Sequence, residues 1–246
     1  MAENVAIDYG IDEPKTVKDL FWRAGTFSAL GIGIFFMNKA EHPGPAMTLL
    51  ILFLLVGLGF LAAGFYLRWS SQVAKLKMRD TLLDKIQWTG DEKVLDVGCG
   101  RGLLAIGAAK RLKKGRVTGI DVWDGSFLSG NKLDAAVENA KEEGVADRVK
   151  IENGNALKLT YGDKSYDVVV SSLVLHGILE TDARAAALRE MVRVLKPGGQ
   201  LGIFDVSTAG EYAGVLREAG ADPVDDSHSA WLGLSAGRFV IARKKS

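Results

Sequence analysis

Hydrophobic residues are concentrated towards the amino-terminal end of the chain. The run from Ala46 to Leu67 holds no charged residue over about 22 positions, and a helix of that length crosses about 30 Å of hydrocarbon. An earlier run, Ala24 to Met37, has only about 14 residues and reaches spanning length by extending back to Leu20. Two prolines and a glycine in residues 38–45 favour a tight connection between the runs. The pattern predicts a transmembrane helical hairpin, with helices at about residues 20–37 and 46–67.

Basic residues flank this hairpin on both sides, whereas Lys39 is the only one between the two runs. Because basic residues stay on the cytoplasmic side of a membrane, both termini and the rest of the chain are expected there, with residues 1–70 as the anchor. Small residues four positions apart, Ala29 with Gly33 and Gly59 with Ala63, are expected where the helices approach each other. Three alternatives stay open: a cleaved signal peptide, a re-entrant first segment, and a buried helical layer of a soluble protein.

The pattern changes after the hairpin. Residues 71–87 place apolar residues at roughly helical spacing among charges, which predicts an amphipathic connecting helix. From residue 88 to 246, β-branched runs alternate with helical patterns, as is typical of a parallel sheet covered by helices. The predicted strands are VLDV, VTGIDV, VKIEN, YDVVVSS and QLGIF. Two β-like pieces at 229–234 and 238–242, joined by a Ser-Ala-Gly turn, predict a closing antiparallel pair. The fold class is therefore α/β, with a doubly wound sheet.

Composition excludes several classes of function. A net charge of +1 gives no global attraction to nucleic acid, and none is expected as a partner. The single cysteine, Cys99, excludes an internal disulfide and a CxxC zinc site, and no metal is expected.

The segment VLDVGCGRG, residues 94–102, carries the strongest chemical signal. An apolar strand runs into Gly98, Gly100 and Gly102 and then into a helical pattern. Glycines allow a ligand to approach the backbone closely, and free N–H groups at a helix start can receive an anionic group. The third glycine comes too early for the dinucleotide fingerprint G-x-G-x-x-G, which weakens an NAD site. Asp96 adds a carboxylate, a partner suited to an ammonium group rather than to a pyrophosphate.

Here the sequence resembles the class I S-adenosylmethionine-dependent methyltransferases, whose first motif is an acidic residue followed by G-x-G-x-G. The resemblance covers most of residues 88–246 and implies a Rossmann-like, seven-stranded sheet, S-adenosylmethionine as cofactor, and methyltransferase activity. It also implies that Asp121 binds the ribose hydroxyls and that Asn155, where the family usually has aspartate, meets the adenine amine. Ala156 and Ser171 are assigned to the same site.

A narrower resemblance, over residues 120–149, is to small bacterial-type methyltransferases with a hydrophobic N-terminal hairpin. Trp123 in this stretch either stacks on the adenine or packs within the protein.

Methyl transfer requires a base only when the acceptor atom is protonated. His176 follows the fourth strand at the carboxyl edge of the sheet and is the candidate general base, with a structural role as the alternative. His228 and Asp205 are secondary candidates, for which a helix-cap or loop role is favoured. His42 lies in the interhelical connection, across the membrane from the predicted site.

The sequence thus predicts a membrane-anchored methyltransferase that acts on a small acceptor. The hypothesis that this acceptor is lipophilic rests on the hairpin alone. A non-catalytic, membrane-tethered S-adenosylmethionine-binding protein and an NAD-dependent oxidoreductase remain as alternatives. A nucleic-acid methyltransferase is disfavoured because Ser171-Ser172-Leu173 stands where an N/D-P-P-Y/W motif follows the fourth strand in such enzymes.

Overall fold

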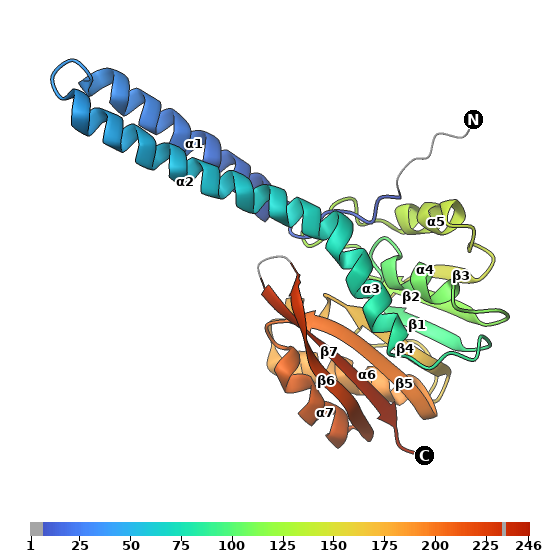
Figure 1. Ribbon diagram of the computed structural model, residues 1–246. Helices are drawn as coiled ribbons and strands as arrows, with labels where there is room; N and C mark the ends of the chain where they lie inside the picture. The colour runs from blue at the N-terminus through green and yellow to red at the C-terminus, as the bar shows by residue number, and fades with distance from the viewer. Residues whose placement is uncertain (1–6, 233–234) are drawn as a thin grey trace.

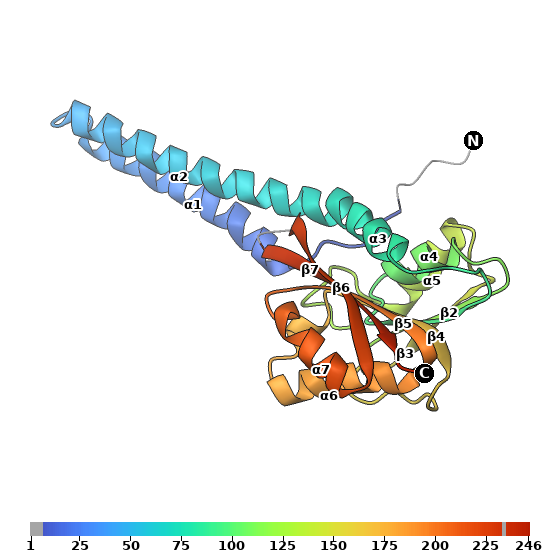
Figure 2. The same ribbon diagram turned by 60° about the horizontal axis from the view of Figure 1, so that its bottom comes forward.

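A long helical hairpin and an α/β domain make up the molecule. The computed structural model describes residues 7–232 and 235–246. In both views of the ribbon the hairpin projects as a rod from the α/β domain (Figures 1 and 2).

The hairpin consists of α1 (Pro14–Asn38) and α2 (Pro43–Trp69). Both helices begin at proline, which is tolerated in the first turn because its missing N–H needs no partner there. This is why α2 starts inside the stretch 38–45 that we expected to be wholly a connection. Both helices are longer than the predicted 20–37 and 46–67.

Small residues do lie between α1 and α2, but they are not the predicted ones. A Cβ atom added to Gly31 would lie 2.5 Å from Phe53, and one on Gly57 would lie 2.6 Å from the Ser28 hydroxyl. A Cβ on Gly33 or Gly59 would meet nothing within 4 Å. Two positions along an α-helix are about 200° apart, so these glycines face away from the partner helix.

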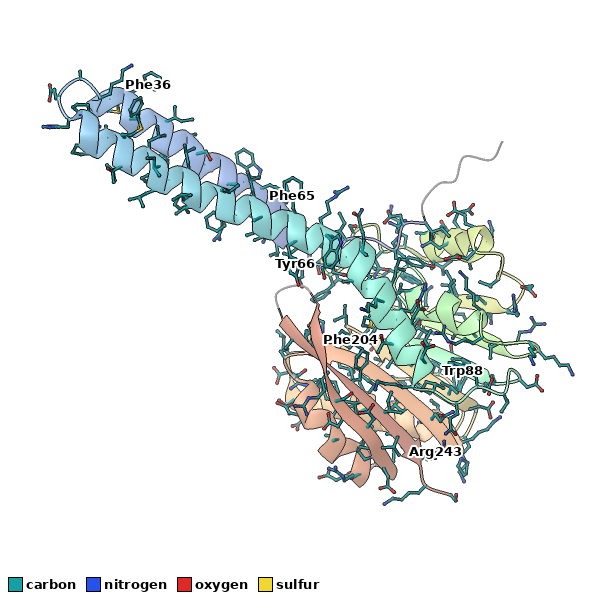
Figure 3. The ribbon with its side chains drawn as sticks, in the orientation of Figure 1. Phe36, Phe65, Tyr66, Trp88, Phe204 and Arg243 are labelled. Atoms are coloured by element: carbon teal, nitrogen blue, oxygen red, sulfur yellow. The ribbon has the colours of Figure 1, made fainter. Side chains whose placement is uncertain are left out.

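Both hairpin helices are long and apolar enough to cross a membrane, judged by length and composition only. In an 18-residue window of each helix, only 11% is buried. That exposure counts against a helical layer buried in a soluble protein. Figure 3 shows Phe36 towards the far end of the hairpin and Phe65 nearer the α/β domain, and their exposed fractions are each 62%.

The helix that begins at Pro43 continues beyond the hairpin. A π-helical turn, Ser70–Ala74, joins α2 to α3 (Lys75–Asp84), so the predicted connecting helix at 71–87 is the end of one long helix. One face of α3 packs on the sheet through Leu82 and Leu83, which are 0% exposed. Val73, which we expected on that apolar face, is 51% exposed because it lies in the π turn, where the helical phase changes.

Seven strands form one sheet in the order β3-β2-β1-β4-β5-β7-β6. Neighbours among β1 to β5 are parallel, whereas β7 runs antiparallel to both β5 and β6. The predicted α/β class is thus confirmed. The strands are β1 (Lys93–Val97), β2 (Arg116–Asp121), β3 (Val149–Asn153), β4 (Tyr166–Ser172), β5 (Leu195–Val206), β6 (Ala221–Leu232) and β7 (Ser235–Lys244).

The closing antiparallel pair is also confirmed, but its bounds were wrong. Residues 235–237, expected as the turn, belong to β7. The connection falls at 233–234, outside the described residues.

Helices cover both faces of the sheet. On one face α3, α4 (Leu103–Ala109) and α5 (Leu133–Glu142) pack over one core cluster, and on the other α6 (Thr181–Val194) and α7 (Tyr212–Glu218) pack over a second. Val94 belongs to the first cluster and Leu95 to the second, as the two-residue period of a strand requires. The strand order reverses between β1 and β4, and ligands of open α/β sheets bind outside the carboxyl ends at such a point.

Candidate functional site

A cavity of about 660 Å³ lies at the carboxyl edge of the sheet. Its walls come from the loops that follow the five parallel strands, from residues near the amino terminus, and from the base of the hairpin. A larger and more open groove of about 990 Å³ runs along α1, but the residues that line it come only from the hairpin. The candidate site therefore belongs to the first cavity, where the chemical groups converge.

The glycine turn between β1 and α4 forms the floor of this cavity. The φ angles of Gly98, Gly100 and Gly102 are +75°, +52° and +87°, in the region that favours glycine. A Cβ on Gly98 would lie 2.2 Å from a methyl carbon of Val174, so a side chain cannot fit there. Gly98 and Gly100 line the cavity, while Gly102 is buried at the start of α4. The turn has the close-approach backbone that a nucleoside-bearing ligand needs.

The first amides of this turn are used inside the protein. The N–H groups of Gly98 and Cys99 donate to the carbonyl oxygen of Ile120, at 2.8 and 2.9 Å. The N–H of Gly100 donates to Asp121 Oδ2 at 2.8 Å. These three amides precede the start of α4, which is where we expected free N–H groups for an anionic group. Their role is instead to tie the glycine turn to the end of β2, which fixes the position of Asp121.

Asp121 lies at the end of β2, lines the cavity and is mostly buried. Besides the Gly100 amide, its carboxylate accepts hydrogen bonds from the N–H of Trp123 at 2.7 Å and from Asn131 Nδ2 at 3.2 Å. A carboxylate has about four acceptor positions, so one remains after these three bonds. The side chain is therefore held rigidly and keeps capacity for a hydroxyl.

Asp96 lies beneath the glycine turn and is 1% exposed. Its Oδ2 accepts from the Ala105 N–H at 2.8 Å, whereas its Oδ1 has no hydrogen-bond partner among the described residues. Burial raises the pKa of Asp96 to about 8, and the charge of Asp121 adds to the rise against the Ala105 hydrogen bond. An unsatisfied buried carboxylate oxygen is the feature that the ammonium group of an amino-acid ligand would satisfy. Asp96 is not among the residues that line the cavity, so that contact stays a prediction.

Asn155 and Ala156, after β3, both line the cavity. The side-chain oxygen of Asn155 accepts from the N–H of Leu157 at 2.9 Å, which orients the amide and uses part of its acceptor capacity. The predicted contact with an adenine amine would use the remaining lone pair.

Trp123 and Ser171 are held within the protein, and neither is among the residues lining the cavity. The indole N–H of Trp123 donates to Asn153 Oδ1 at 2.6 Å, which favours the packing alternative for this ring. The hydroxyl of Ser171 is buried and donates to the carbonyl oxygen of Val97 at 2.8 Å. Val122 and Ser172, their neighbours in the chain, line the cavity instead.

His176 and Asp205 form a pair at the ends of β4 and β5. His176 Nδ1 lies 2.6 Å from Asp205 Oδ1, and His176 lines the cavity. Asp205 is 1% exposed and its Oδ2 also accepts from the N–H groups of Leu175 and His176, at 2.9 and 3.1 Å. The hydroxyl of Tyr212 donates to the same oxygen at 3.1 Å. Asp205 therefore holds both the ring and the backbone of His176 in position, and its carboxylate accepts from the first two N–H groups of the short helix Leu175–Gly177.

Two opposing effects set the proton affinity of His176. Burial, the largest single effect, would lower its pKa, but the hydrogen bond and charge of Asp205, together with the charges of Glu13 and Asp12, raise the pKa of His176 overall. A neutral imidazole that donates from Nδ1 to a carboxylate keeps Nε2 as an acceptor, which is the arrangement that a general base needs.

The other histidine candidate, His228, lies on β6 opposite Arg238, and its side chain is outside the described part of the structure. Across residues 7–232 and 235–246, no group of three or more His, Cys, Asp or Glu side chains could hold a metal ion.

Residues 8–13, called the N-terminal segment below, form a wall of the cavity that the sequence did not predict. The buried ammonium of Lys75 donates to the carbonyl oxygens of Tyr9 and Gly10 at 2.9 and 2.6 Å, and to Asp12 at 3.3 Å. On its other side, the N–H of Ile11 donates to Ser129 Oγ at 2.7 Å. No local pattern encodes contacts between residues so distant in the chain.

Comparison with known proteins agrees with this geometry. Residues 94–199 match the family described as "Methyltransferase domain". Methyltransferase GfsG of Streptomyces halstedii is 34% identical over 134 residues, which cover 54% of this chain and 45% of the relative. A demethylmenaquinone methyltransferase of Lactiplantibacillus plantarum is 34% identical over 130 residues, covering 52% of this chain and 51% of the relative. The chain spans about half the length of these curated relatives.

Among solved structures, the fold is similar to 1,6-didemethyltoxoflavin-N1-methyltransferase of Burkholderia thailandensis with bound S-adenosylhomocysteine. The TM-score is 0.57 at 22% identity, and the match covers 72% of this chain and 81% of the other. S-adenosylmethionine is the cofactor of these related methyltransferases. The glycine turn, the Asp121 carboxylate and the unpartnered Oδ1 of Asp96 fit this cofactor. Residues 94–199 therefore carry a methyltransferase domain, and the relatives and fold neighbours support the class I S-adenosylmethionine-dependent type.

Proposed function

We propose that the protein is a membrane-anchored methyltransferase that transfers the methyl group of S-adenosylmethionine to a small, lipophilic acceptor. One observation carries the proposal. A single cavity is lined by the glycine turn and Asp121, by His176, and by residues at the base of the hairpin. A cofactor site, a candidate base and the membrane-proximal part of the chain therefore meet in one place.

The cofactor half of the cavity supplies binding and orientation. S-adenosylmethionine, when bound, supplies a methyl group on a cationic sulfur and leaves as S-adenosylhomocysteine. We assign Asp121 to the ribose hydroxyls, Asn155 and Ala156 to the adenine, and Asp96 to the ammonium group. Gly98 and Gly100 let the ligand lie against the backbone, and positioning of the two reactants can supply most of the catalysis.

The other half of the cavity supplies a base. Nε2 of His176 accepts the proton of an acceptor hydroxyl as its oxygen forms the bond to the methyl carbon. Asp205 holds the imidazole in the required tautomer and stabilises the imidazolium that forms. This assignment predicts an acceptor whose reacting atom carries a proton, such as a hydroxyl, because a neutral amine would not need a base before attack.

In this proposal the hairpin is the membrane anchor, and the cavity lies at the membrane surface. Residues 1–70 form the anchor, residues 71–87 the connection and residues 88–246 the catalytic domain. We assign both termini and the catalytic domain to the cytoplasmic side, an orientation that the basic residues outside the two apolar runs support. Thr16 and Leu67, at the base of α1 and α2, line the cavity, so an acceptor partitioned into the bilayer would meet it directly. The similarity to a demethylmenaquinone methyltransferase supports a lipophilic acceptor.

Titration calorimetry of the detergent-solubilised protein with S-adenosylhomocysteine tests the cofactor. We expect binding that Asp121→Ala abolishes and that Asp134→Ala, a change of an exposed carboxylate on α5, leaves intact. Failure of the folded wild-type protein to bind would refute the proposal, and binding of NAD instead would favour an oxidoreductase.

Turnover is tested in lipid nanodiscs with isotope-labelled S-adenosylmethionine and a panel of acceptors fractionated from membrane extracts. Labelled product that requires His176 supports the proposal. Cofactor binding without turnover across the whole panel would favour the non-catalytic alternative. Equal turnover of water-soluble and membrane-partitioned acceptors would contradict the lipophilic assignment.

A further inference from the structure

Two carboxylates of the N-terminal segment share the cavity with the candidate base. Asp12 and Glu13 line the same cavity as His176, although they lie more than 160 positions away in the chain. Both of their charges contribute to the raised pKa of His176, after the larger effects of burial and Asp205. The amino-terminal end of the protein therefore supplies negative charge close to the imidazole.

The backbone of the N-terminal segment fixes where these carboxylates lie. The N–H of Asp12 donates to Ser71 Oγ at 3.0 Å, and the N–H of Glu13 donates to the carbonyl oxygen of Phe127 at 2.9 Å. Glu13 is the residue before α1 and has a φ of +50°, a conformation that L-residues rarely adopt. The segment is thus attached both to the long helix and to the loop between β2 and α5, so its side chains are not those of a free terminus.

The cationic side chains that line the cavity are already paired. Lys75 lies 3.3 Å from Asp12, and Arg101 Nη1 lies 2.8 Å from Asp8 Oδ2. Glu13 is exposed and forms no ion pair among the residues that the structure describes; its carboxylate accepts only from the Thr16 hydroxyl, at 3.3 Å. The charge facing His176 from this side is therefore negative.

We infer that the acceptor pocket beside His176 selects by charge, taking uncharged hydroxyl compounds and rejecting carboxylates and phosphate esters. This inference rests on the proposed function. An anionic acceptor would face Glu13 and the Asp12 side of the cavity, where each lining cation already has a carboxylate partner, and the excess of lining carboxylates repels a ligand of the same sign. An uncharged hydroxyl carries no such penalty, and it retains the proton that His176 is placed to remove.

A matched pair of probes tests the selection: 4-hydroxybenzamide and 4-hydroxybenzoate, which share a phenol and differ mainly in charge. The full-length protein in detergent, labelled with ¹³C-histidine and saturated with S-adenosylhomocysteine, is titrated with each probe, and the His176 ring signals are followed by NMR. His176→Gln identifies those signals. We expect the benzamide to bind at least about tenfold more tightly than the benzoate, a difference of about 1.4 kcal/mol.

Two variants link the selection to the two carboxylates. Asp12→Asn with Glu13→Gln should remove most of the tenfold difference and lower the pKa of His176, while S-adenosylhomocysteine affinity stays within about twofold. Glu13→Gln alone changes an exposed side chain. It should reduce the difference in probe affinity and lower the pKa of His176, each by less than the double variant does. Asp19→Asn removes an exposed carboxylate from α1 that does not line the cavity, and it should change neither.

Equal affinity for the two probes, no binding of the benzamide, or an unchanged His176 pKa in the double variant would each overturn the inference. The probe titrations are interpreted only for protein samples that bind S-adenosylhomocysteine. If the wild-type protein does not bind S-adenosylhomocysteine, the proposed function is refuted instead.

Discussion

The hairpin and the α/β domain use the same apolar residue types in opposite ways. In the domain, Leu95 and Leu104 are 0% and 1% exposed. In the hairpin, Leu55 and Leu58 are 58% and 60% exposed. Water drives apolar side chains inward, whereas hydrocarbon gives them no reason to leave the surface. The exposed leucines of the hairpin are what the proposed membrane anchor requires.

The interior of the hairpin shows the same contrast. Its contact is made by glycines and by aromatic pairs, such as Phe21 with Phe65 at a ring separation of 5.3 Å. The domain instead packs large aliphatic and aromatic side chains of both sheet faces into two clusters. The contact between α1 and α2 is therefore stabilised by the close approach of the two backbones rather than by burial of large apolar side chains.

The largest expected effect lies where the two regions meet. His176→Gln should lower the turnover number by about 10²- to 10⁴-fold, the usual contribution of a general base, with little change in S-adenosylhomocysteine affinity. Initial rates in nanodiscs measure the effect. A loss confined to KM would contradict a role in proton transfer.

The pH dependence sharpens this assignment. The pKa of His176 is raised above its ordinary 6.5, so the imidazole is protonated, and unable to act as a base, until the pH exceeds a midpoint above that value. The rate should therefore rise with pH through this midpoint. Asp205→Asn removes the largest of the charges that raise this pKa and should move the midpoint to lower pH, while Asp12 and Glu13 still face the ring. An unchanged midpoint would show that another group titrates.

Replacing one leucine in each region by alanine compares how much each side chain contributes to stability. Leu95→Ala should lower the free energy of unfolding of the α/β domain by about 2–5 kcal/mol, because it leaves a cavity in a fully buried core. Leu55→Ala should change it by less than about 0.5 kcal/mol, because that side chain supports no packed core. Denaturant titration in detergent, followed by the fluorescence of the domain, compares the two. Similar losses would mean that the hairpin is packed like the domain.

Glycine substitutions test the hairpin interior. Gly57→Leu should destabilise the contact between α1 and α2 by about 1–3 kcal/mol, because a Cβ there already meets Ser28 at 2.6 Å. Gly59→Leu is the control, since its Cβ would meet nothing within 4 Å. Disulfide trapping between cysteines introduced on α1 and α2 reports the separation of the helices. Equal disulfide yields in the Gly57→Leu and Gly59→Leu variants would mean that Gly57 does not lie in the contact between α1 and α2.

The smallest effect concerns the junction of the two regions. Lys75→Met removes the donor shared by Tyr9, Gly10 and Asp12, and should lower local protection of the N-terminal segment by about 1 kcal/mol. Hydrogen exchange of the Ile11 and Glu13 amides measures it. Unchanged exchange at both amides would mean that the hydrogen bonds to Ser129 and Phe127 hold the segment alone.

Much of the domain was predictable because its signals are local. A strand that runs into Gly98 and Gly100, followed by Asp121 one strand later, depends on neighbours in the chain, and the structure places these three residues together. The pairing of His176 with Asp205 also had a signal that we did not use. Both residues follow strands expected to be adjacent, and the carboxyl ends of adjacent parallel strands meet at one edge.

The wall formed by the N-terminal segment was not predictable in the same way. Tyr9 and Lys75 meet only after the hairpin doubles the chain back. The orientation of the hairpin glycines was missed for another reason. Spacing four apart identifies one face of a helix, but it does not say whether that face meets the partner or the surroundings, so Gly33 was chosen where Gly31 makes the contact.

The unbroken helix from Pro43 to Asp84 makes the link between the two regions stiff. At 1.5 Å per residue, its 42 residues extend over about 60 Å, and its final turns are fastened to the sheet by Leu82 and Leu83. In the proposed membrane anchor, a flexible tether would let the catalytic domain search the volume above the bilayer, whereas this stiff helix would hold the cavity at a fixed height and orientation. A thicker or thinner bilayer changes the tilt of such a helix. A change in lipid composition would then change the orientation of the cavity opening relative to the molecules that diffuse in the bilayer beneath it.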